Sequence, residues 1–114
     1  MKPGDLVLMR FPQTDLETGK LRPALVVALT PGRHSDLLLA FVSSRIYQAV
    51  PDFDELISPS DTDYAHTGLK TSSVIRLGRL VTVDKTVINA HLGYISVQRL
   101  HIIRQRLANW LDSD

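Results

Sequence analysis

The sequence predicts a mainly β fold, an SH3-like small barrel of about five to seven strands carrying one C-terminal α-helix. Short apolar stretches recur over most of the chain, and proline, glycine or polar turn residues end each of them. The last stretch differs, because apolar residues after Ser96 recur at helical spacing. The chain has 114 residues, so we expect a single domain over residues 1–114 with a core of its own.

The strand predictions rest on apolar or β-branched runs that are bounded by turn residues. They cover residues 4–11, 22–29, 36–43, 53–57, 72–76 and 80–83. Between the first two runs, residues 13–21 are rich in turn residues, and Gly19 is expected to take a positive φ. Gly78 separates the last two runs and predicts a bulge or bend there. Residues 61–68 are predicted to form a loop.

One amphipathic helix is predicted to close the chain. Ser96 is the expected N-cap, because its hydroxyl can accept a hydrogen bond from a backbone N–H of the first turn. The apolar face is predicted to consist of Leu100, Ile103, Leu107 and Trp110 or Leu111. The polar face is predicted to consist of Arg99, Gln105, Arg106 and Asn109.

The amino-acid composition excludes several kinds of functional site. The chain contains no cysteine, which excludes disulfides, cysteine nucleophiles and cysteine-based metal sites. No segment resembles a signal peptide or a membrane-spanning run, so we expect a soluble, cytoplasmic protein without a membrane partner. The four histidines are scattered without ligand spacing, so neither a metal nor another cofactor is expected. His66, in a polar loop, is retained as an acid–base candidate, with an ordinary solvated histidine as the alternative.

The charge balance argues against a general electrostatic attraction to nucleic acid, because 13 basic and 12 acidic side chains leave a net charge of only +1. The charges are nevertheless unevenly distributed. Acidic residues gather within 52–55, within 61–63 and at the C-terminal end, whereas basic residues gather within 76–79 and 99–106. A local basic face therefore remains compatible with the sequence.

The Arg-Pro step at the start of the second predicted strand is the strongest local signal. Proline fixes its own φ and holds the preceding residue extended, so Arg22 is expected to sit rigidly at the mouth of a strand. The planar guanidinium of a positioned arginine is well suited to bind phosphate. Arg22 is therefore a candidate phosphate contact.

Several segments together resemble the PemK/MazF family of toxin endoribonucleases. These segments are Gly4-Asp5-Leu6-Val7, Gly19-Lys20-Leu21-Arg22-Pro23-Ala24-Leu25-Val26-Val27, Val42-Ser43-Ser44, Ser73-Val74-Ile75-Arg76 and Thr82-Val83-Asp84-Lys85. The similarity keeps its order along nearly the whole chain. It implies the toxin of a type II toxin–antitoxin pair, a homodimer that cleaves single-stranded RNA, including mRNA, sequence-selectively and without metal. It also implies a cognate antitoxin as partner.

The resemblance also assigns roles to individual residues. The ribose 2′-hydroxyl would attack the adjacent phosphate, with Arg22 and Ser43 at that catalytic centre. Arg76 would add a phosphate contact, and the remaining substrate-binding candidates are Ser44, Asp15 and Glu17. The base that takes the hydroxyl proton is left open among Asp15, Glu17 and His66. The aromatic candidates for stacking on RNA bases are Phe11, Tyr47, Phe53 and Tyr64.

Each of these residues also has a purely structural interpretation. Arg22 can pair with Asp15 or Glu17, Ser43 can simply end a strand, and Arg76 can pair with an acid such as Asp84. Asp84 itself is expected to accept backbone hydrogen bonds in a turn.

The chain also departs from the family pattern. It has no histidine in residues 13–21, Gly78 stands where some members have an acid, and Val81 stands where an arginine is common. Two alternative functions therefore stay open. One is a non-catalytic SH3-like module that binds RNA or protein, and the other is a toxin of the same fold that acts on DNA gyrase.

Overall fold

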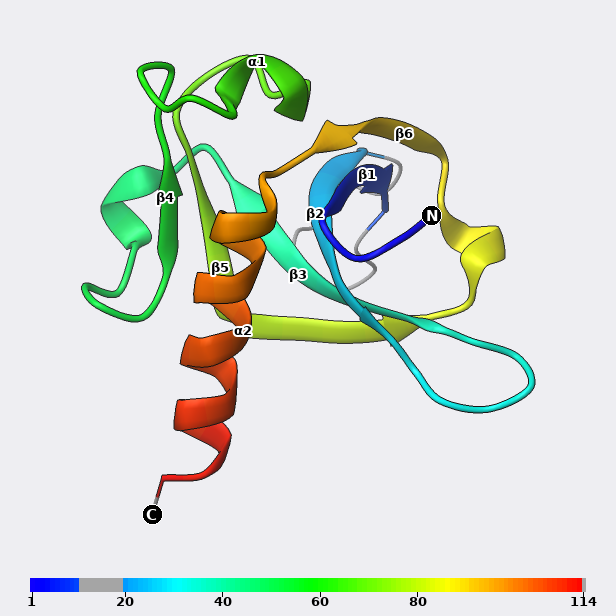
Figure 1. Cartoon of the computed structure of the whole chain (residues 1–114). Helices are drawn as coiled ribbons and strands as arrows, with labels where there is room; N and C mark the ends of the chain where they lie inside the picture. The colour runs from blue at the N-terminus through cyan, green and yellow to red at the C-terminus, as the bar shows by residue number, and fades with distance from the viewer. Residues whose placement is uncertain (11–19, 114) are drawn as a thin grey trace.

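The computed structural model describes residues 1–10 and 20–113, which form a half-barrel of six antiparallel strands with a C-terminal helix (Figure 1). The strands are β1 (Asp5–Met9), β2 (Arg22–Leu29), β3 (Leu37–Ser43), β4 (Glu55–Ile57), β5 (Ser73–Val83) and β6 (Ala90–Tyr94). The helices are α1 (Tyr64–Thr67) and α2 (Val97–Leu111), with single 3₁₀ turns η1 (Ile46–Gln48) and η2 (Lys85–Val87). The strands follow the order β4-β5-β3-β2-β1-β6 across the sheet. The predicted fold class is confirmed.

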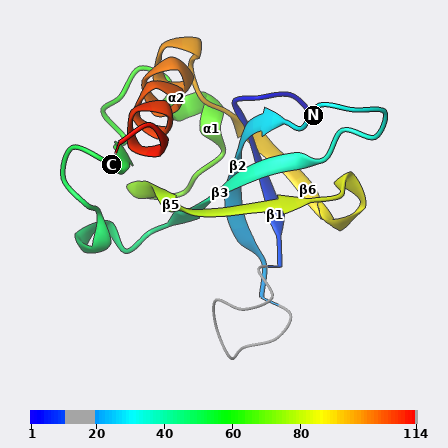
Figure 2. The same cartoon turned by 90° about the horizontal axis from the view of Figure 1, so that it is seen from below.

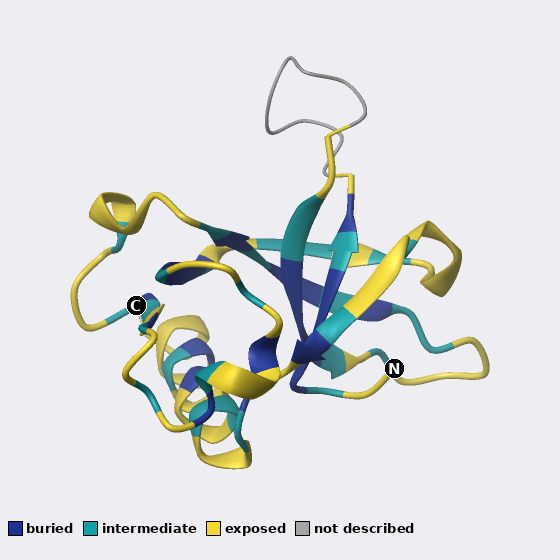
Figure 3. Ribbon diagram, turned by 90° about the horizontal axis from the view of Figure 1, so that it is seen from above, coloured by how far each residue is buried: buried dark blue, intermediate teal, exposed yellow. Residues whose placement is uncertain are grey.

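The two faces of the curled sheet bury separate apolar clusters (Figures 2 and 3). This follows from strand geometry, because successive side chains point to opposite faces. Helix α2 covers one face, which we call the α2 face, and the cluster there comprises Leu6, Leu25, Val27, Ala40, Val42, Ile57, Ile75, Leu77, Ile95, Ile103 and Leu107. The cluster on the opposite face comprises Val7, Met9, Ala24, Val26, Leu37 and Leu39.

Strand β5 joins two segments that the sequence predicts as separate strands, so that division is wrong. The predicted irregularity at Gly78 is confirmed. Ala40 of β3 pairs with Leu80, but its neighbour Phe41 pairs with Arg76, so the register shifts across the intervening residues of β5. A bulge of this kind bends a strand and redirects its side chains.

The observed elements differ from the predictions at several further places. Strand β6 was not predicted, because Ala90–Tyr94 shows no clear alternation and depends on pairing with β1. Residues 61–68 contain the short helix α1, and the strand predicted over 53–57 begins only at Glu55. Strand β1 ends at Met9, and the predictions for Phe11 and Gly19 lie outside the described residues.

Helix α2 begins as predicted. The Ser96 hydroxyl accepts a hydrogen bond from the backbone N–H of Arg99 at 3.1 Å, which confirms the N-cap. Ile103 and Leu107 are buried, and Trp110 contacts Phe53 edge-to-face with ring centroids 5.3 Å apart, whereas Leu111 is 71% exposed. Trp110 thus completes the apolar face. No helix in the described part of the chain has the length and apolar character that crossing a membrane requires.

Arg99, which was predicted to lie on the polar face of the helix, is largely removed from solvent. Its side chain is 12% exposed, and its guanidinium binds the carboxylates of Glu55 at 2.8 Å, Asp61 at 2.8 Å and Asp63 at 2.9 Å. Hydrogen bonding from Arg99, opposed by burial, lowers the pKa of Asp63 from 3.8 to about 2. This cluster, which we call the Arg99 cluster, ties α2 to the segment from β4 to α1. The acidic and basic groups noted in the sequence thus partly neutralise each other.

Candidate functional site

Strand register gathers polar side chains at one end of the sheet, on the face opposite α2. Arg22 lies two residues before Ala24 on β2, and Ser43 lies two residues after Phe41 on β3, so each shares a face with its partner. Phe41 pairs with Ala24 on one side and with Arg76 on the other. Three neighbouring strands therefore bring Arg22, Ser43 and Arg76 together.

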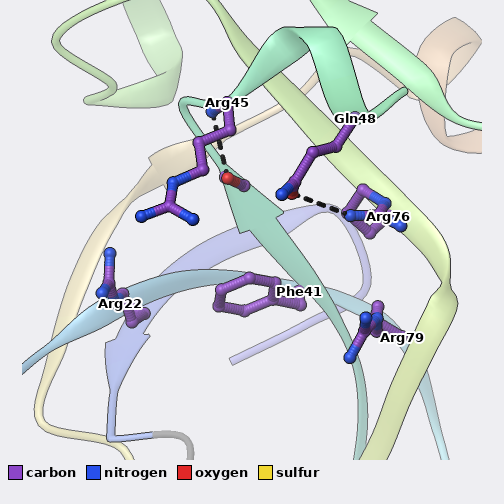
Figure 4. A pocket seen from close by; sticks show the side chains of 7 residues that line it. Arg22, Phe41, Arg45, Gln48, Arg76 and Arg79 are labelled. Carbon is purple, nitrogen blue, oxygen red and sulfur yellow. Dashed lines mark hydrogen bonds between the residues drawn. The ribbon is translucent and has the colours of Figure 1, made fainter. Parts of the chain in front are cut away.

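These side chains line a cleft of about 170 Å³, which we call the cationic cleft. Its lining consists of Arg22, Phe41, Ser43, Arg45, Gln48, Arg76 and Arg79. Figure 4 shows Phe41 in the middle, with the four arginines arranged around it. Arginine stays protonated and donates hydrogen bonds in a planar fork, and among the residues that the structure describes neither an aspartate nor a glutamate lines the cleft. The cleft is therefore suited to an anion with several oxygen acceptors, such as a phosphate.

Ser43 has a defined hydrogen-bonding state. Its Oγ accepts a hydrogen bond from the backbone N–H of Arg45 at 3.0 Å. A hydroxyl has one hydrogen to donate, and an N–H donor occupying a lone pair leaves that hydrogen for another acceptor. The local turn after β3 thus prepares Ser43 to donate to an oxygen in the cleft.

The guanidinium of Arg76 is held by Asp54, which does not itself line the cleft. The Arg76 Nε lies 3.2 Å from Asp54 Oδ2, and its Nη1 donates to Gln48 Oε1 at 3.1 Å. The Asp54 side chain is 1% exposed, and its two oxygens also accept from the backbone N–H groups of Leu77 and Val50, both at 2.9 Å. These bonds fix the carboxylate, and through it the orientation of the guanidinium.

Arg76 therefore pairs with an acid, as its structural interpretation expected, but that acid is Asp54 and not Asp84. Asp84 Oδ1 instead accepts a hydrogen bond from Thr86 N at 2.8 Å and caps η2, which confirms its predicted role in a turn. Asp54 was the less obvious partner, because it reaches Arg76 only through the pairing of β4 with β5.

The other candidates are placed as follows. Ser44 lies outside the cationic cleft and borders a neighbouring pocket that Arg22 and Ser43 also line. His66 is exposed on α1 and stacks on Tyr94 with centroids 5.1 Å apart, away from the cleft lining. Asp15 and Glu17, including their pairing with Arg22, lie outside the described residues.

None of the described stacking candidates lines the cleft. Tyr47 is exposed on η1, whereas Phe53 packs on Trp110 and Tyr64 packs against the core on the α2 face. Phe11 lies outside the described residues.

Sequence reasoning missed Phe41, Arg45, Gln48 and Arg79 as cleft residues. A signal for Phe41 was present, because strand alternation places it on the face of Ser43. Arg79 depends on the bulge beside Gly78, and Gln48 depends on the 3₁₀ turn η1. Neither can be located without tertiary structure.

The cleft supplies donors and positive charge, but its described lining contains no histidine or carboxylate. Among the described residues, no group of three or more His, Asp or Glu side chains is placed to hold a metal ion. The lining therefore has what is needed to bind phosphate and to stabilise added negative charge on it.

A small half-barrel with a cleft of arginines and a serine at one end of its strands defines a small β-barrel protein with a cationic site. The chain belongs to the family of PemK-like, MazF-like toxins of type II toxin–antitoxin systems, whose family model matches residues 2–111. A comparison with curated proteins gave no match.

Solved structures of similar fold include the Mycobacterium tuberculosis toxin MazF-mt6. It superposes with a TM-score of 0.68 at 15% sequence identity, covering 96% of this chain and 98% of that one. Another is an endoribonuclease in complex with its cognate antitoxin from a mycobacterial species, with a TM-score of 0.67 and 17% identity over 100% of this chain and 97% of that one. At these identities, the similarity establishes a shared fold.

Proposed function

We propose that this toxin is a metal-independent endoribonuclease that cleaves single-stranded RNA, mRNA included, at selected sequences. The observation that carries the proposal is the convergence of Arg22, Ser43 and Arg76 in one cationic cleft. Membership of the toxin family and the fold shared with a protein described as an endoribonuclease support it.

In the proposed reaction, the 2′-hydroxyl oxygen of a ribose attacks the adjacent phosphorus, and the bond from phosphorus to the 5′-oxygen breaks. The products are a 2′,3′-cyclic phosphate and a 5′-hydroxyl. Arg22 and Arg76 stabilise the negative charge that develops on the phosphorane oxygens, since their guanidinium groups donate in a plane. Ser43 donates its hydroxyl hydrogen to a non-bridging oxygen. The attacking nucleophile is the substrate's own hydroxyl, so the reaction needs no metal-bound water.

The reaction also requires a group that takes the proton of the 2′-hydroxyl and one that protonates the leaving 5′-oxygen. Arg22 is proposed to assist the leaving oxygen. For the base, Asp15 and Glu17 remain the candidates. His66 is no longer preferred, because it does not line the cleft.

A cognate antitoxin is the proposed protein partner. The cleft carries four arginines, so an acidic, partly disordered antitoxin segment would complement its charge and block RNA. The structural neighbour solved with its own antitoxin supports such a partner. A homodimer is likewise proposed, and light scattering of the purified protein tests it.

Incubation of purified protein with a mixed-sequence RNA, with and without a chelator, tests the proposed function. We expect cleavage that is unaffected by the chelator and that yields 2′,3′-cyclic phosphate ends. Arg22→Ala should lower the cleavage rate by about a hundredfold to a thousandfold. Substitution of an exposed arginine in the turn between β2 and β3, Arg33→Ala, should leave the rate unchanged.

The alternatives give different outcomes in this assay. RNA that is bound but left intact by the folded protein would favour a non-catalytic binding module, an option that the missing base in the described lining keeps open. Inhibition of DNA gyrase without loss of RNA would favour the gyrase-directed toxin. Cleavage that disappears with the chelator would contradict the metal-independent mechanism.

A further inference from the structure

A second pocket adjoins the cationic cleft. It measures about 310 Å³, and Arg22 and Ser43 line it as well as the cleft. We call it the flanking pocket. Its walls are mainly apolar and include Leu8, Pro23, Val42, Leu69 and Leu92.

The flanking pocket lies on the α2 face, whereas the cationic cleft lies on the opposite face. On β2, Pro23 shares a face with Leu25, and on β3, Val42 shares a face with Ala40, and both partners belong to the core on the α2 face. In the described part of the chain, the residues that line both cavities are Arg22, where β2 begins, and Ser43, where β3 ends. A ligand that holds a phosphate in the cleft can reach the flanking pocket by crossing this edge.

The outer wall of the flanking pocket is built from a fixed loop. Gly68 has φ +73°, and a side chain there would collide with the backbone carbonyl of Leu92, so the loop lies directly against β6. The Thr67 hydroxyl accepts from the backbone N–H of Leu69 at 3.1 Å, and the Ser73 hydroxyl donates to the carbonyl of Thr71 at 3.0 Å. These contacts shape the pocket in advance of binding, which reduces the entropy cost of filling it.

The rim of the pocket is polar. Ser44, Lys70 and Thr71 line it and are exposed. An apolar slot accepts the flat faces of a nucleobase, and hydroxyl and ammonium groups at its rim can hydrogen-bond the edge of that base. Lys70 can only donate, so it favours uracil O4 and guanine O6, carbonyl oxygens at the position where cytosine and adenine carry an amino group.

We propose that the flanking pocket binds the base of a nucleotide next to the phosphate held in the cationic cleft, and that Lys70 and Thr71 select that base. This inference rests on the proposed function and deepens it, because it names the site that selects an RNA base. Continuity with the cleft through Arg22 and Ser43 favours a nucleotide, since one nucleotide carries a phosphate and a base at fixed separation. Ser44, predicted from the sequence as substrate-binding, falls in this specificity site.

The test is to sequence the cut ends produced from an RNA pool randomised around the cleavage site. The wild-type protein should prefer uracil or guanine at one position flanking the cut. Lys70→Glu should shift that preference towards bases with amino groups, adenine or cytosine, because a carboxylate accepts from amino groups. Thr71→Val should weaken selection at the same position. Lys85→Glu makes the same charge change beyond the far end of β5 and should leave the preference unaltered.

Where a variant cuts RNA too slowly for its cut ends to be sequenced, its binding to RNA is measured instead. Replacing the base at the flanking position by an abasic site should weaken binding to the wild-type protein by roughly fivefold or more. The same replacement should matter less to the Thr71→Val variant.

The outcomes separate the two proposals. If the wild-type protein cuts RNA but neither Lys70→Glu nor Thr71→Val alters the base preference, the base site is refuted and the endoribonuclease stands. If Lys70→Glu weakens only antitoxin binding, the pocket holds a peptide and the base site is again refuted. If the folded wild-type protein neither cuts nor binds RNA, the proposed function fails, and the base site fails with it.

Discussion

The Arg99 cluster and the cationic cleft both concentrate arginine, but they balance its charge in different ways. Arg99 is held by three carboxylates, from Glu55, Asp61 and Asp63, all within 2.9 Å. The cleft brings together four arginines, its lining within residues 1–10 and 20–113 contains no carboxylate, and Asp54 binds Arg76 from outside that lining.

The difference separates a structural role from a binding role. A buried guanidinium requires partners inside the protein, because an isolated charge loses its hydration on burial. Arg99 satisfies this requirement entirely within the fold. The described lining of the cleft instead gathers positive charge, a distribution that favours an external anion. Substitutions in the two regions should therefore affect different quantities.

The largest effect on stability should come from Arg99→Ala. Removing this side chain leaves Asp61 and Asp63 without the cation that binds them and leaves Glu55 with Arg106 alone, so the free energy of unfolding should fall by about 3 to 5 kcal/mol. Denaturant unfolding measures the change, with Arg33→Ala as the control. A loss below roughly 1 kcal/mol would mean that the cluster behaves like an ordinary surface ion pair.

Lowering the pH should remove part of the stabilisation that the Arg99 cluster provides. The pKa of Asp63 is about 2 in the folded protein against 3.8 in the reference state, mainly because Arg99 donates to it. A carboxyl group whose pKa is lowered by folding contributes its full stabilisation only at pH values above its pKa in the unfolded chain. The contribution, about 2 kcal/mol, should therefore be lost as the pH falls from about 5 through 3.8 towards 2. Unfolding measured across this range should show a flatter pH profile for Asp63→Asn. An unchanged profile would contradict the assignment.

Asp54 should act on the cleft only through Arg76. We expect Asp54→Asn to lower RNA cleavage roughly tenfold, because Arg76 loses the carboxylate that orients it. In an Arg76→Ala background the same substitution should have almost no further effect on cleavage. Rates are compared per folded molecule, because Asp54 also binds the backbone of Leu77 and Val50. Equal losses in both backgrounds would show that Asp54 acts independently of Arg76.

The smallest effect should appear in the salt dependence of RNA binding. Each arginine that contacts a phosphate should contribute about 0.7 to the slope of log affinity against log salt for a single strand. Arg45→Ala and Arg79→Ala should each reduce the slope by about that amount. Arg33→Ala should leave the slope unchanged. If Arg45→Ala and Arg79→Ala also leave the wild-type slope unchanged, these two arginines do not contact RNA phosphates.

Local sequence predicted much of this site. The Arg-Pro step located Arg22, and the family resemblance added Ser43 and Arg76, which strand register then brings together. The partner of Arg76 was not predictable, because Asp54 lies across a short strand, whereas Asp84 lies closer in the sequence.

Two further features were not predicted from the sequence, for the same reason. Strand β6 has weak alternation and depends on β1, and its pairing cannot be inferred from its own residues. Arg99 was predicted only as part of the polar face of the helix, because helical periodicity does not reveal which loop packs there. In each case the deciding contact joins residues that are distant along the chain.

The most direct test of the proposed division of roles compares Arg22→Ala with Arg99→Ala in both cleavage and unfolding assays. Arg22→Ala should lower RNA cleavage by about a hundredfold to a thousandfold while changing the free energy of unfolding by less than about 1 kcal/mol. Arg99→Ala should do the reverse, with near wild-type cleavage per folded molecule. If Arg22→Ala keeps full cleavage, or if its loss of activity only follows a loss of stability, the central claim is contradicted.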